Sequence, residues 1–310
     1  MIETRRTIPK PEDRDEWLAV RRPFFNASYA AVLFDEHPYV TAGDVATIKL
    51  TGKEQAQTRA MDRGRRLEDV IGKWWADEHG CEVYEPNKLY VCGRVMATVD
   101  RLVDDGGAEP LMPVEIKTAN VIAPEPLPYW LCQCQAIMLC TGAQRLALVW
   151  FDSTMDLRSR TIEANARMME SINEGAERFM AAIDMGMVPD WVGLSYANQT
   201  DLHPEARVPP VELDDAGFNT VMALRFVRSQ RIAAEREEER IKAEMAGLLG
   251  DHEAGTFGGR EIIRWSNVKG RRDLDTKRLA VEHPEIVADY TVQRDGTRRM
   301  VLVGTDEEAA

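Results

Sequence analysis

MATVDRLVDDGGAEPLMPVEIKTA, residues 96–119, sets the architecture expected for this chain. Residues 95–103 are mostly apolar and include β-branched side chains, the run DDGG supplies turn chemistry, and residues 114–118 return to an apolar alternation. The pattern predicts two short strands joined by a turn. Because side chains alternate along a strand, Glu115 and Lys117 share one face of the second strand.

Asp100 comes at the end of the first predicted strand, where it can lie beside Glu115. Two carboxylates would then converge within reach of one divalent cation, next to the ammonium of Lys117. Hard cations such as Mg²⁺ are bound through carboxylates and substrate phosphates, as a phosphodiester-cleaving site requires. The alternative is a solvated charged face with no chemistry.

A long helix is predicted over residues 57–79, with Gly80 as its end. One of its faces carries residues spaced by three and four positions: Gly64, Leu67, Ile71 and Trp75. Glu68 lies on the same face, where a lone carboxylate is costly without a partner. That partner is either a cation or water in a polar cleft, or an arginine such as Arg65 or Arg101.

A second informative helix is predicted over residues 129–140, between a proline-rich bend at residues 124–128 and Gly142. Gln133 and Gln135 lie among its apolar positions. A glutamine in a helix usually faces solvent, so this pattern alone assigns no chemistry.

Near the N-terminus, residues 12–22 predict a short helix that is acidic at its start and basic at its end, as the helix dipole favours. Pro23 ends it, and a further helix is expected to begin at Asn26 or Ser28. On this pattern alone, Arg21 is a surface residue and Ser28 a cap.

In this order, the motifs resemble the lambda-exonuclease/YqaJ-like viral recombinase family of the PD-(D/E)-x-K nuclease superfamily. The resemblance is carried by the string RGRRLED at residues 63–69, by Asp-x14-Glu-x-Lys from Asp100 to Lys117, and by Tyr-x3-Gln-x-Gln from Tyr129. Two departures stand out. The family commonly has Pro-Asp-Gly around the aspartate, where this chain has VDR, and related nucleases often have tyrosine at the position of Ile137.

The resemblance implies roles for the site residues. The groups expected to bind Mg²⁺ or Mn²⁺ are Asp100, Glu115 and the carbonyl of Ile116. Lys117 is expected to orient the attacking water and to offset charge at phosphorus, while Glu68 assists through a second metal or its water. Gln133 is expected to position the nucleophile or the DNA backbone.

The resemblance also suggests where DNA binds. Trp17, Arg21 and Ser28 are similar in order to the opening of lambda exonuclease, where the arginine and serine lie at the pocket for the 5′ phosphate. A hydroxyl and free amides at a helix start suit a phosphate. Arg65 belongs to a basic group just before the site and is expected to contact DNA.

The expected fold is α/β (α+β), a restriction-endonuclease-like mixed β-sheet core flanked by helices, with a C-terminal helical and small β appendage. The exonuclease domain is placed at residues 1–195 and the appendage, a DNA-contacting or oligomerisation arm, at residues 196–310. Further predicted elements are strands within residues 81–102 and at residues 145–152, 157–163, 261–265 and 300–303, helices at residues 42–50, 166–185 and 214–249, and a loop at residues 191–211.

The implied activity is that of a Mg²⁺-dependent, phage-type 5′-to-3′ exonuclease acting on double-stranded DNA ends and leaving 3′ single strands for homologous recombination. Expected partners are a single-strand annealing protein and further copies of the chain in a ring such as a trimer. The alternatives are a nuclease-fold protein that binds DNA ends or scaffolds recombination without activity, and an endonuclease of the same superfamily.

Composition bounds these expectations. The chain of 310 residues has a net charge of −13, which argues against a simple wrap-around DNA binder, but the arginines at residues 59–66 allow a local basic channel. Five cysteines without Cys-x2-Cys spacing fit a reducing compartment and do not predict an iron–sulfur cluster. With no membrane span or secretory signal expected, the protein should be cytoplasmic. The family resemblance implies that a phage or prophage encodes it in a bacterial host.

Overall fold

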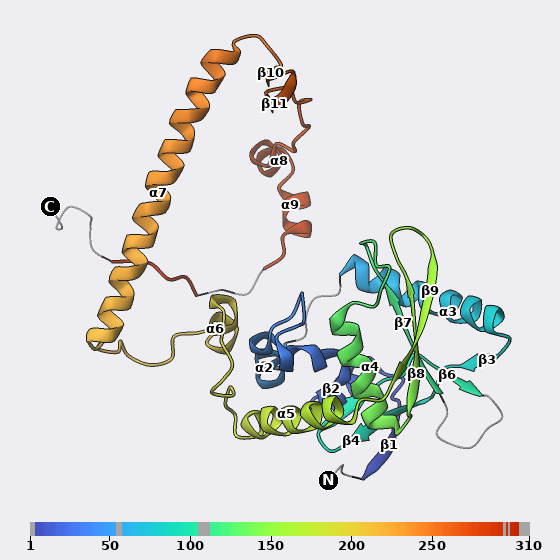
Figure 1. The fold of residues 1–310 in the computed structure, drawn as a ribbon. Coiled ribbons are helices and arrows are strands. Elements are labelled where there is room, and N and C mark those ends of the chain that lie inside the picture. Colours follow the sequence, from blue (N-terminus) through green and yellow to red (C-terminus); the bar gives the residue numbers. More distant parts are fainter. Residues whose placement is uncertain (1–3, 54–57, 105–111, 294–295, 297, 304–310) are drawn as a thin grey trace. The chain divides into compact units, whose positions relative to one another are not determined.

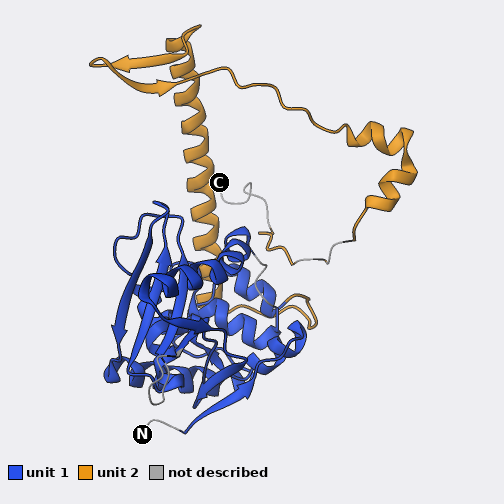
Figure 2. Cartoon of the chain, turned by 90° about the vertical axis from the view of Figure 1, so that its right-hand side faces the viewer, with its two compact units in different colours: residues 1–203 blue, residues 204–310 orange. Residues whose placement is uncertain are grey.

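The computed structural model describes residues 4–53, 58–104, 112–293, 296 and 298–303. Contacts between residues divide the chain into two units, Met1–His203 and Pro204–Ala310, which Figure 2 distinguishes by colour. The predicted DDGG turn continues into residues 105–111, which lie outside the described part of the chain.

The first unit contains a mixed five-stranded sheet with the strand order β3-β6-β7-β8-β9 (Figure 1). The strands are β3 (Glu82–Tyr84), β6 (Arg101–Asp104), β7 (Met112–Thr118), β8 (Arg145–Phe151) and β9 (Leu157–Glu163). β7 and β8 are parallel, whereas the other neighbouring strands pair antiparallel. A mixed sheet flanked by helices is the α/β fold that the sequence predicted.

A four-stranded sheet lies beside it in the order β1-β4-β5-β2. Its strands are β1 (Arg5–Pro9), β2 (Phe25–Asn26), β4 (Lys88–Cys92) and β5 (Val95–Ala97). The single strand predicted over residues 95–103 was therefore wrong, because the chain passes from this sheet into the five-stranded sheet between β5 and β6. Both halves are apolar and buried, so periodicity could not show the break. Asp100 lies at this passage, just before β6.

The helices of the first unit are α1 (Arg14–Arg21), η1 (Ala27–Phe34), α2 (Ala42–Thr51), α3 (Arg59–His79), α4 (Pro128–Thr141), α5 (Ala166–Asp184) and α6 (Tyr196–Leu202). The helix expected to begin at Asn26 or Ser28 is the 3₁₀ helix η1, and its N-cap residue Asn26 makes no side-chain cap bond. α6 was missed inside the loop predicted at residues 191–211. It begins with a capping box between Ser195 and Asn198.

The two faces of the five-stranded sheet pack against different helices, which fixes the direction of the charged side chains. Val114 and Ile116 of β7 belong to one apolar cluster with Ile71 and Trp75 of α3. Buried residues of β8 on the other face, Leu146, Leu148 and Trp150, belong to a cluster with α4, α5 and η1. Since neighbours on β7 alternate, its charged side chains turn away from α3 and toward α4.

The second unit contains α7 (Asp215–Leu249), β10 (Ala254–Phe257), β11 (Arg260–Arg264), α8 (Thr276–Glu282) and α9 (Pro284–Tyr290). β10 and β11 form a two-stranded antiparallel sheet. The strand predicted at residues 300–303 was wrong: this segment is irregular, and Arg225 Nη2 of α7 donates to the Val303 carbonyl at 2.6 Å. Among the described residues, none of the helices has the length and apolar character needed to cross a membrane.

Candidate active site

Two carboxylates meet where β6 and β7 pair. The antiparallel register joins Arg101 to Val114, so the preceding residue, Asp100, comes opposite Glu115. Asp100 Oδ2 accepts a hydrogen bond from the Ile116 backbone N–H at 2.8 Å. Glu115 is only 2% exposed. The structure thus brings together the carboxylate pair that the sequence predicted.

Lys117 and Gln133 complete this group from β7 and α4. Lys117 Nζ lies 2.6 Å from Glu115 Oε1 and 2.9 Å from Gln133 Oε1. Gln133 Nε2 donates to the same Glu115 oxygen. α4 begins with Pro128 and ends at Gly142 in the left-handed conformation, which sets the length of the helix and the position of Gln133 on it. Gln133 therefore faces the site rather than solvent.

Burial disfavours the charged forms of the side chains in this group. It raises the pKa of Glu115 to about 8, with the neighbouring Asp100 adding to the effect. Burial likewise raises the pKa of Asp100. Burial opposes the charged form of Lys117, but Glu115 and Asp100 raise its pKa overall. The ammonium would lower the pKa of a carboxylate in contact with it, yet burial and the second carboxylate outweigh this effect at Glu115.

These residues fit a hard divalent cation. Glu115 Oε2 is buried and has no hydrogen-bond partner in the described part of the chain, an arrangement that costs free energy unless a ligand satisfies the atom. Among the described residues, no three Asp, Glu, His or Cys side chains are arranged to hold a metal by themselves. Mg²⁺ would therefore rely on Asp100 and Glu115 plus waters and substrate phosphates, as it usually does.

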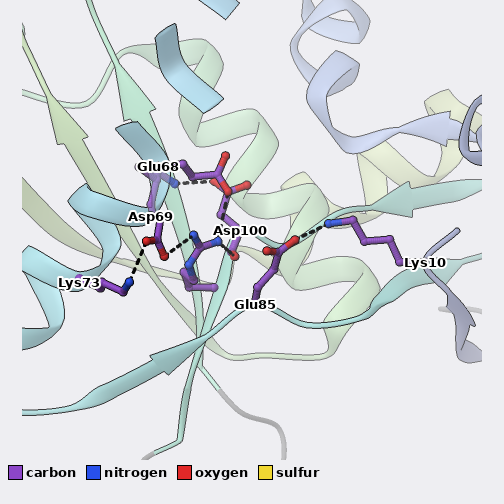
Figure 3. A network of polar contacts seen from close by, with 8 residues as sticks. Lys10, Glu68, Asp69, Lys73, Glu85 and Asp100 are labelled. Carbon is purple, nitrogen blue, oxygen red and sulfur yellow. Dashed lines mark hydrogen bonds and ion pairs between the residues drawn. The ribbon is translucent and has the colours of Figure 1, made fainter. Parts of the chain in front are cut away.

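Glu68 approaches the pair from α3 but is bound to an arginine. Arg101 Nη1 lies 3.2 Å from Glu68 Oε1, and Arg101 Nη2 lies 3.4 Å from Asp69 Oδ1. Figure 3 shows Glu68, Asp69 and Asp100 gathered around these contacts, with the Lys10–Glu85 ion pair nearby. Burial and the charge of Asp100 raise the pKa of Glu68 to about 7.

The arginine partner left open by the sequence is thus Arg101, not Arg65. Arg65 is exposed, and its Nη2 lies 3.9 Å from Asp62 Oδ1 on the same helix. The structure therefore does not bring Arg65 together with Glu68, Asp100 and Glu115. Arg101 also donates to the Asp100 carbonyl at 2.5 Å. Its 8% exposed side chain therefore links Glu68 to the backbone that carries the aspartate.

Arg21 lies at a separate cavity of about 220 Å³. The residues lining it are Asp15, Leu18, Ala19, Arg21, Arg22, Asn26, Tyr29, Ile48, Lys49 and Gly52. The Arg21 guanidinium stacks 4.0 Å from the Trp17 ring centroid. Asn26 Oδ1 is buried with no hydrogen-bond partner in the described residues. Ser28 is exposed and does not line the cavity, so the structure does not bring it together with Arg21 there.

Lys49 is a lining residue that sequence reasoning missed. It is 5% exposed on α2 and donates from Nζ to the carbonyls of Arg21 and Phe24 at 3.0 and 2.6 Å. A lysine between Ile48 and Leu50 was the available signal, because a charge in an apolar helical run needs partners. Lys49 fixes the turn that follows α1 and places positive charge at the cavity.

A mixed sheet with Asp100 just before β6 and with Glu115 and Lys117 on β7 is the arrangement expected from the resemblance to PD-(D/E)-x-K nucleases. Residues 16–144 match the model of the YqaJ-like viral recombinase domain, so this part of the chain is similar to that family. The matched range contains every predicted site residue, from Arg21 to Gln133. No curated protein matches the sequence significantly.

Solved structures similar to this chain include an alkaline exonuclease, LHK-Exo, from Laribacter hongkongensis. It is 24% identical, with a TM-score of 0.44 over 55% of this chain and 93% of that one. Its complex with dAMP gives 23% identity and a TM-score of 0.45 over the same shares. A phage-related exonuclease from Haemophilus somnus 129PT is 11% identical, with a TM-score of 0.41 over 53% of this chain and 92% of that one.

Proposed function

We propose that this protein is a metal-dependent deoxyribonuclease that degrades double-stranded DNA from its ends in the 5′-to-3′ direction and leaves 3′ single strands for recombination. The observation that carries the proposal is the contact group of Glu115, Lys117 and Gln133 beside Asp100, with one buried Glu115 oxygen left without a partner. The family of residues 16–144 and the names of the similar structures support the same activity.

In the proposed reaction, Asp100, Glu115 and the Ile116 carbonyl would hold Mg²⁺ or Mn²⁺. Such a cation would supply Lewis-acid chemistry, polarising the phosphate and lowering the pKa of water. Lys117 has Glu115 and Gln133 on either side, so its ammonium is fixed where it can orient the water and offset charge developing at phosphorus. Such fixed charges act without reorganising during the reaction.

Gln133 and Glu68 support this group. Gln133 contacts both the ammonium and the carboxylate, so it holds their separation and presents its amide to the nucleophile or the DNA backbone. Glu68 is partly buried beside Asp100 and would assist through a second cation or its water. Because Glu68 also contacts Arg101, the same carboxylate would have to serve both the ion pair and this role.

The cavity at Arg21 is the proposed site for a 5′ phosphate. A stacked guanidinium offers planar donors that can hold two phosphate oxygens, and Lys49 adds positive charge. Ser28 and Arg65 remain proposed DNA contacts from the sequence alone. The second unit is proposed as an arm that contacts DNA or further copies of the chain, with a single-strand annealing protein as partner.

One digestion tests the activity. Linear duplexes bearing a 5′ phosphate or a 5′ hydroxyl, and a covalently closed circle, are incubated with Mg²⁺, with Mn²⁺ and with chelator. Loss of one strand from linear DNA only, starting at the phosphorylated 5′ end and requiring a cation, is the expected result. Cutting of the closed circle would indicate an endonuclease, and end binding without cutting would indicate a scaffold.

A further inference from the structure

Three aromatic rings lie at the edge of the carboxylate and lysine group, outside the residues used above. His37 and Tyr39 come from the loop between η1 and α2, and Tyr129 from the first turn of α4. Ring centroids are 6.2 Å apart for Tyr39 and Tyr129 and 5.6 Å apart for His37 and Tyr129. These distances are typical of aromatic pairs in contact.

α4 connects this cluster to the reacting group. Tyr129 precedes Gln133 by four residues on α4, so the two side chains lie on one face about 6 Å apart along the axis. Gln133 in turn contacts Lys117 at 2.9 Å. The charge of Lys117 also reaches the cluster: after burial, it is the second cause that lowers the pKa of His37. The aromatic cluster therefore borders the site on the α4 side.

The inner rings are fixed, whereas the outer ring is open to solvent. His37 Nδ1 accepts the backbone N–H groups of Val40 at 3.0 Å and Tyr39 at 3.3 Å, which holds the loop and its ring. Tyr129 packs against Trp130, a residue only 2% exposed, at a centroid distance of 5.7 Å. Tyr39 is 77% exposed despite its two ring neighbours.

We propose that Tyr39 and Tyr129 form a base-binding subsite in which the exposed Tyr39 ring stacks on the base of a nucleotide whose phosphate lies at Glu115 and Lys117. The proposal rests on the nuclease function proposed above and identifies a group that holds the substrate. Every base has a flat face that an aromatic ring can stack on, so the subsite accepts any base. A phosphate at Lys117 and a base at Tyr39 are contacts that one nucleotide can make together.

Stacking separates this role from an ordinary surface tyrosine. An exposed ring contributes little to the folded state, so its removal should leave stability unchanged while weakening the hold on one base. Stacking on an aromatic side chain changes affinity by about tenfold per base, with a wide range. The effect should depend on the presence of the base and not on the 5′ phosphate.

The test compares intact duplex with duplexes carrying one abasic site at each terminal nucleotide in turn, all labelled at the far end. Binding is measured by fluorescence anisotropy in chelator, and kcat/KM separately with Mg²⁺. Wild type should bind one abasic duplex about tenfold more weakly than intact DNA. Tyr39→Leu should bind that abasic duplex and the intact duplex with equal affinity, and its melting temperature should be unchanged. Tyr39→Phe should keep the difference in affinity between the two duplexes. Tyr84→Leu, at a tyrosine on β3 that is 43% exposed, is the control.

Equal binding of every abasic duplex by wild type, or a difference that survives in Tyr39→Leu, would overturn the subsite. Because binding is measured without a cation, it is independent of cleavage. Base-dependent binding without any cleavage would refute the proposed nuclease and leave the subsite standing. Cleavage without base-dependent binding would refute the subsite and leave the proposed nuclease standing.

Discussion

Lys117 keeps its charge in a setting that would ordinarily favour the neutral amine. Burial opposes the ammonium, but two carboxylates within reach more than compensate and raise its pKa. The side chain is 21% exposed, in contrast to the solvated face that was the alternative reading of Glu-x-Lys. A lysine held in this way is a fixed positive charge beside the unpartnered oxygen of Glu115.

Lys117→Met should therefore lower kcat by at least about a hundredfold, because a preorganised charge at the transition state is lost. Stability should fall by about 1–3 kcal/mol, since Glu115 loses a partner, but the chain should remain folded because Glu115 can take up a proton. Cleavage per folded molecule and urea unfolding measure the two effects. Lys73→Met removes an exposed lysine paired with Asp69 and is the control. Wild-type cleavage by Lys117→Met would remove Lys117 from the mechanism.

Glu68 forms an ion pair with Arg101, and a catalytic role is proposed for the same carboxylate. Glu68→Gln retains an oxygen that can accept from Arg101, so the free energy of unfolding should change by less than about 1 kcal/mol. Groups that support metal ligands commonly affect activity by about ten- to a hundredfold, and a loss of that size is expected here. Glu78→Gln, on the same helix, is the matched control. Normal activity with a large loss of stability would make Glu68 a structural residue.

Arg21 allows a test of end recognition that does not involve the carboxylates. Wild type should prefer 5′-phosphorylated over 5′-hydroxyl ends, and Arg21→Ala should lose about ten- to a hundredfold of that preference, because a charge-assisted hydrogen bond is lost. Ser28→Ala should change the preference less, since Ser28 does not line the cavity. Competition between the two kinds of end gives the ratio directly. Equal use of both ends by wild type would contradict the phosphate site while leaving the catalytic group untouched.

At the scale of elements, the end of β8 holds the connection between β7 and α4. Asp152 follows β8 and accepts from the Ala123 N–H at 3.0 Å, from the Thr154 N–H at 2.8 Å and from the Thr154 hydroxyl. The segment from residue 119 to residue 127 joins the strand of Lys117 to the helix of Gln133. Its anchor at Asp152 therefore helps to place both residues.

Asp152 should make stability depend on pH. Hydrogen bonds from Thr154 are the main cause that lowers its pKa from 3.8 to about 2. A carboxylate whose pKa is lower in the folded state stabilises the fold at pH values above its unfolded-state pKa. This stabilisation is lost as the pH falls from about 4 to about 2. Asp152→Asn should be less stable than wild type at pH 7 and converge with it near pH 2. Urea unfolding across this range measures the difference, with Asp156→Asn as the control. A constant difference at all pH values would contradict the argument.

The sequence predicted those elements whose periodicity and ends are both explicit. The strand that carries Glu115 and Lys117 followed from the alternation of its side chains. α3 and α4 followed from apolar spacing and from the glycine that comes directly after the last residue of each helix. The passage between the two sheets before Asp100 was not predictable, because a buried apolar run has the same pattern on either sheet. α6 is a short helix whose capping box is its main signal.

The side-chain groups were predictable only where the backbone pattern fixed them. The alternation of β7 placed Glu115 and Lys117 together, and the helix repeat placed Glu68 toward the sheet. The choice of Arg101 over Arg65 as partner for Glu68 depended on the strand pairing that brings β6 under α3. The aromatic cluster joins a loop to a helix far along the chain, and no local pattern encodes such a contact.

At the scale of the whole molecule, α7 offers a surface for association. Its residues Phe218, Met222 and Phe226 follow each other at four-residue intervals and are 59%, 46% and 64% exposed. Residues with this spacing lie on one side of a helix, and an exposed apolar stripe of this kind commonly packs against a partner. A second copy of the chain is the occupant we expect, in keeping with the oligomer proposed above for this chain.

The full-length chain should therefore be an oligomer by light scattering, and the double variant Phe218→Ser, Phe226→Ser should shift to a smaller mass at the same concentration. Each ring is worth about 2 kcal/mol when buried, so association should weaken by about a hundredfold or more. Phe257→Ser, at a 79% exposed ring on β10, controls for loss of apolar surface in general. Because the proposed catalytic group lies in the first unit, the double variant is expected to cut DNA still, though with shorter runs if a ring encloses the duplex. An unchanged mass would assign the stripe on α7 to another contact and would leave the oligomer to be sought on the first unit.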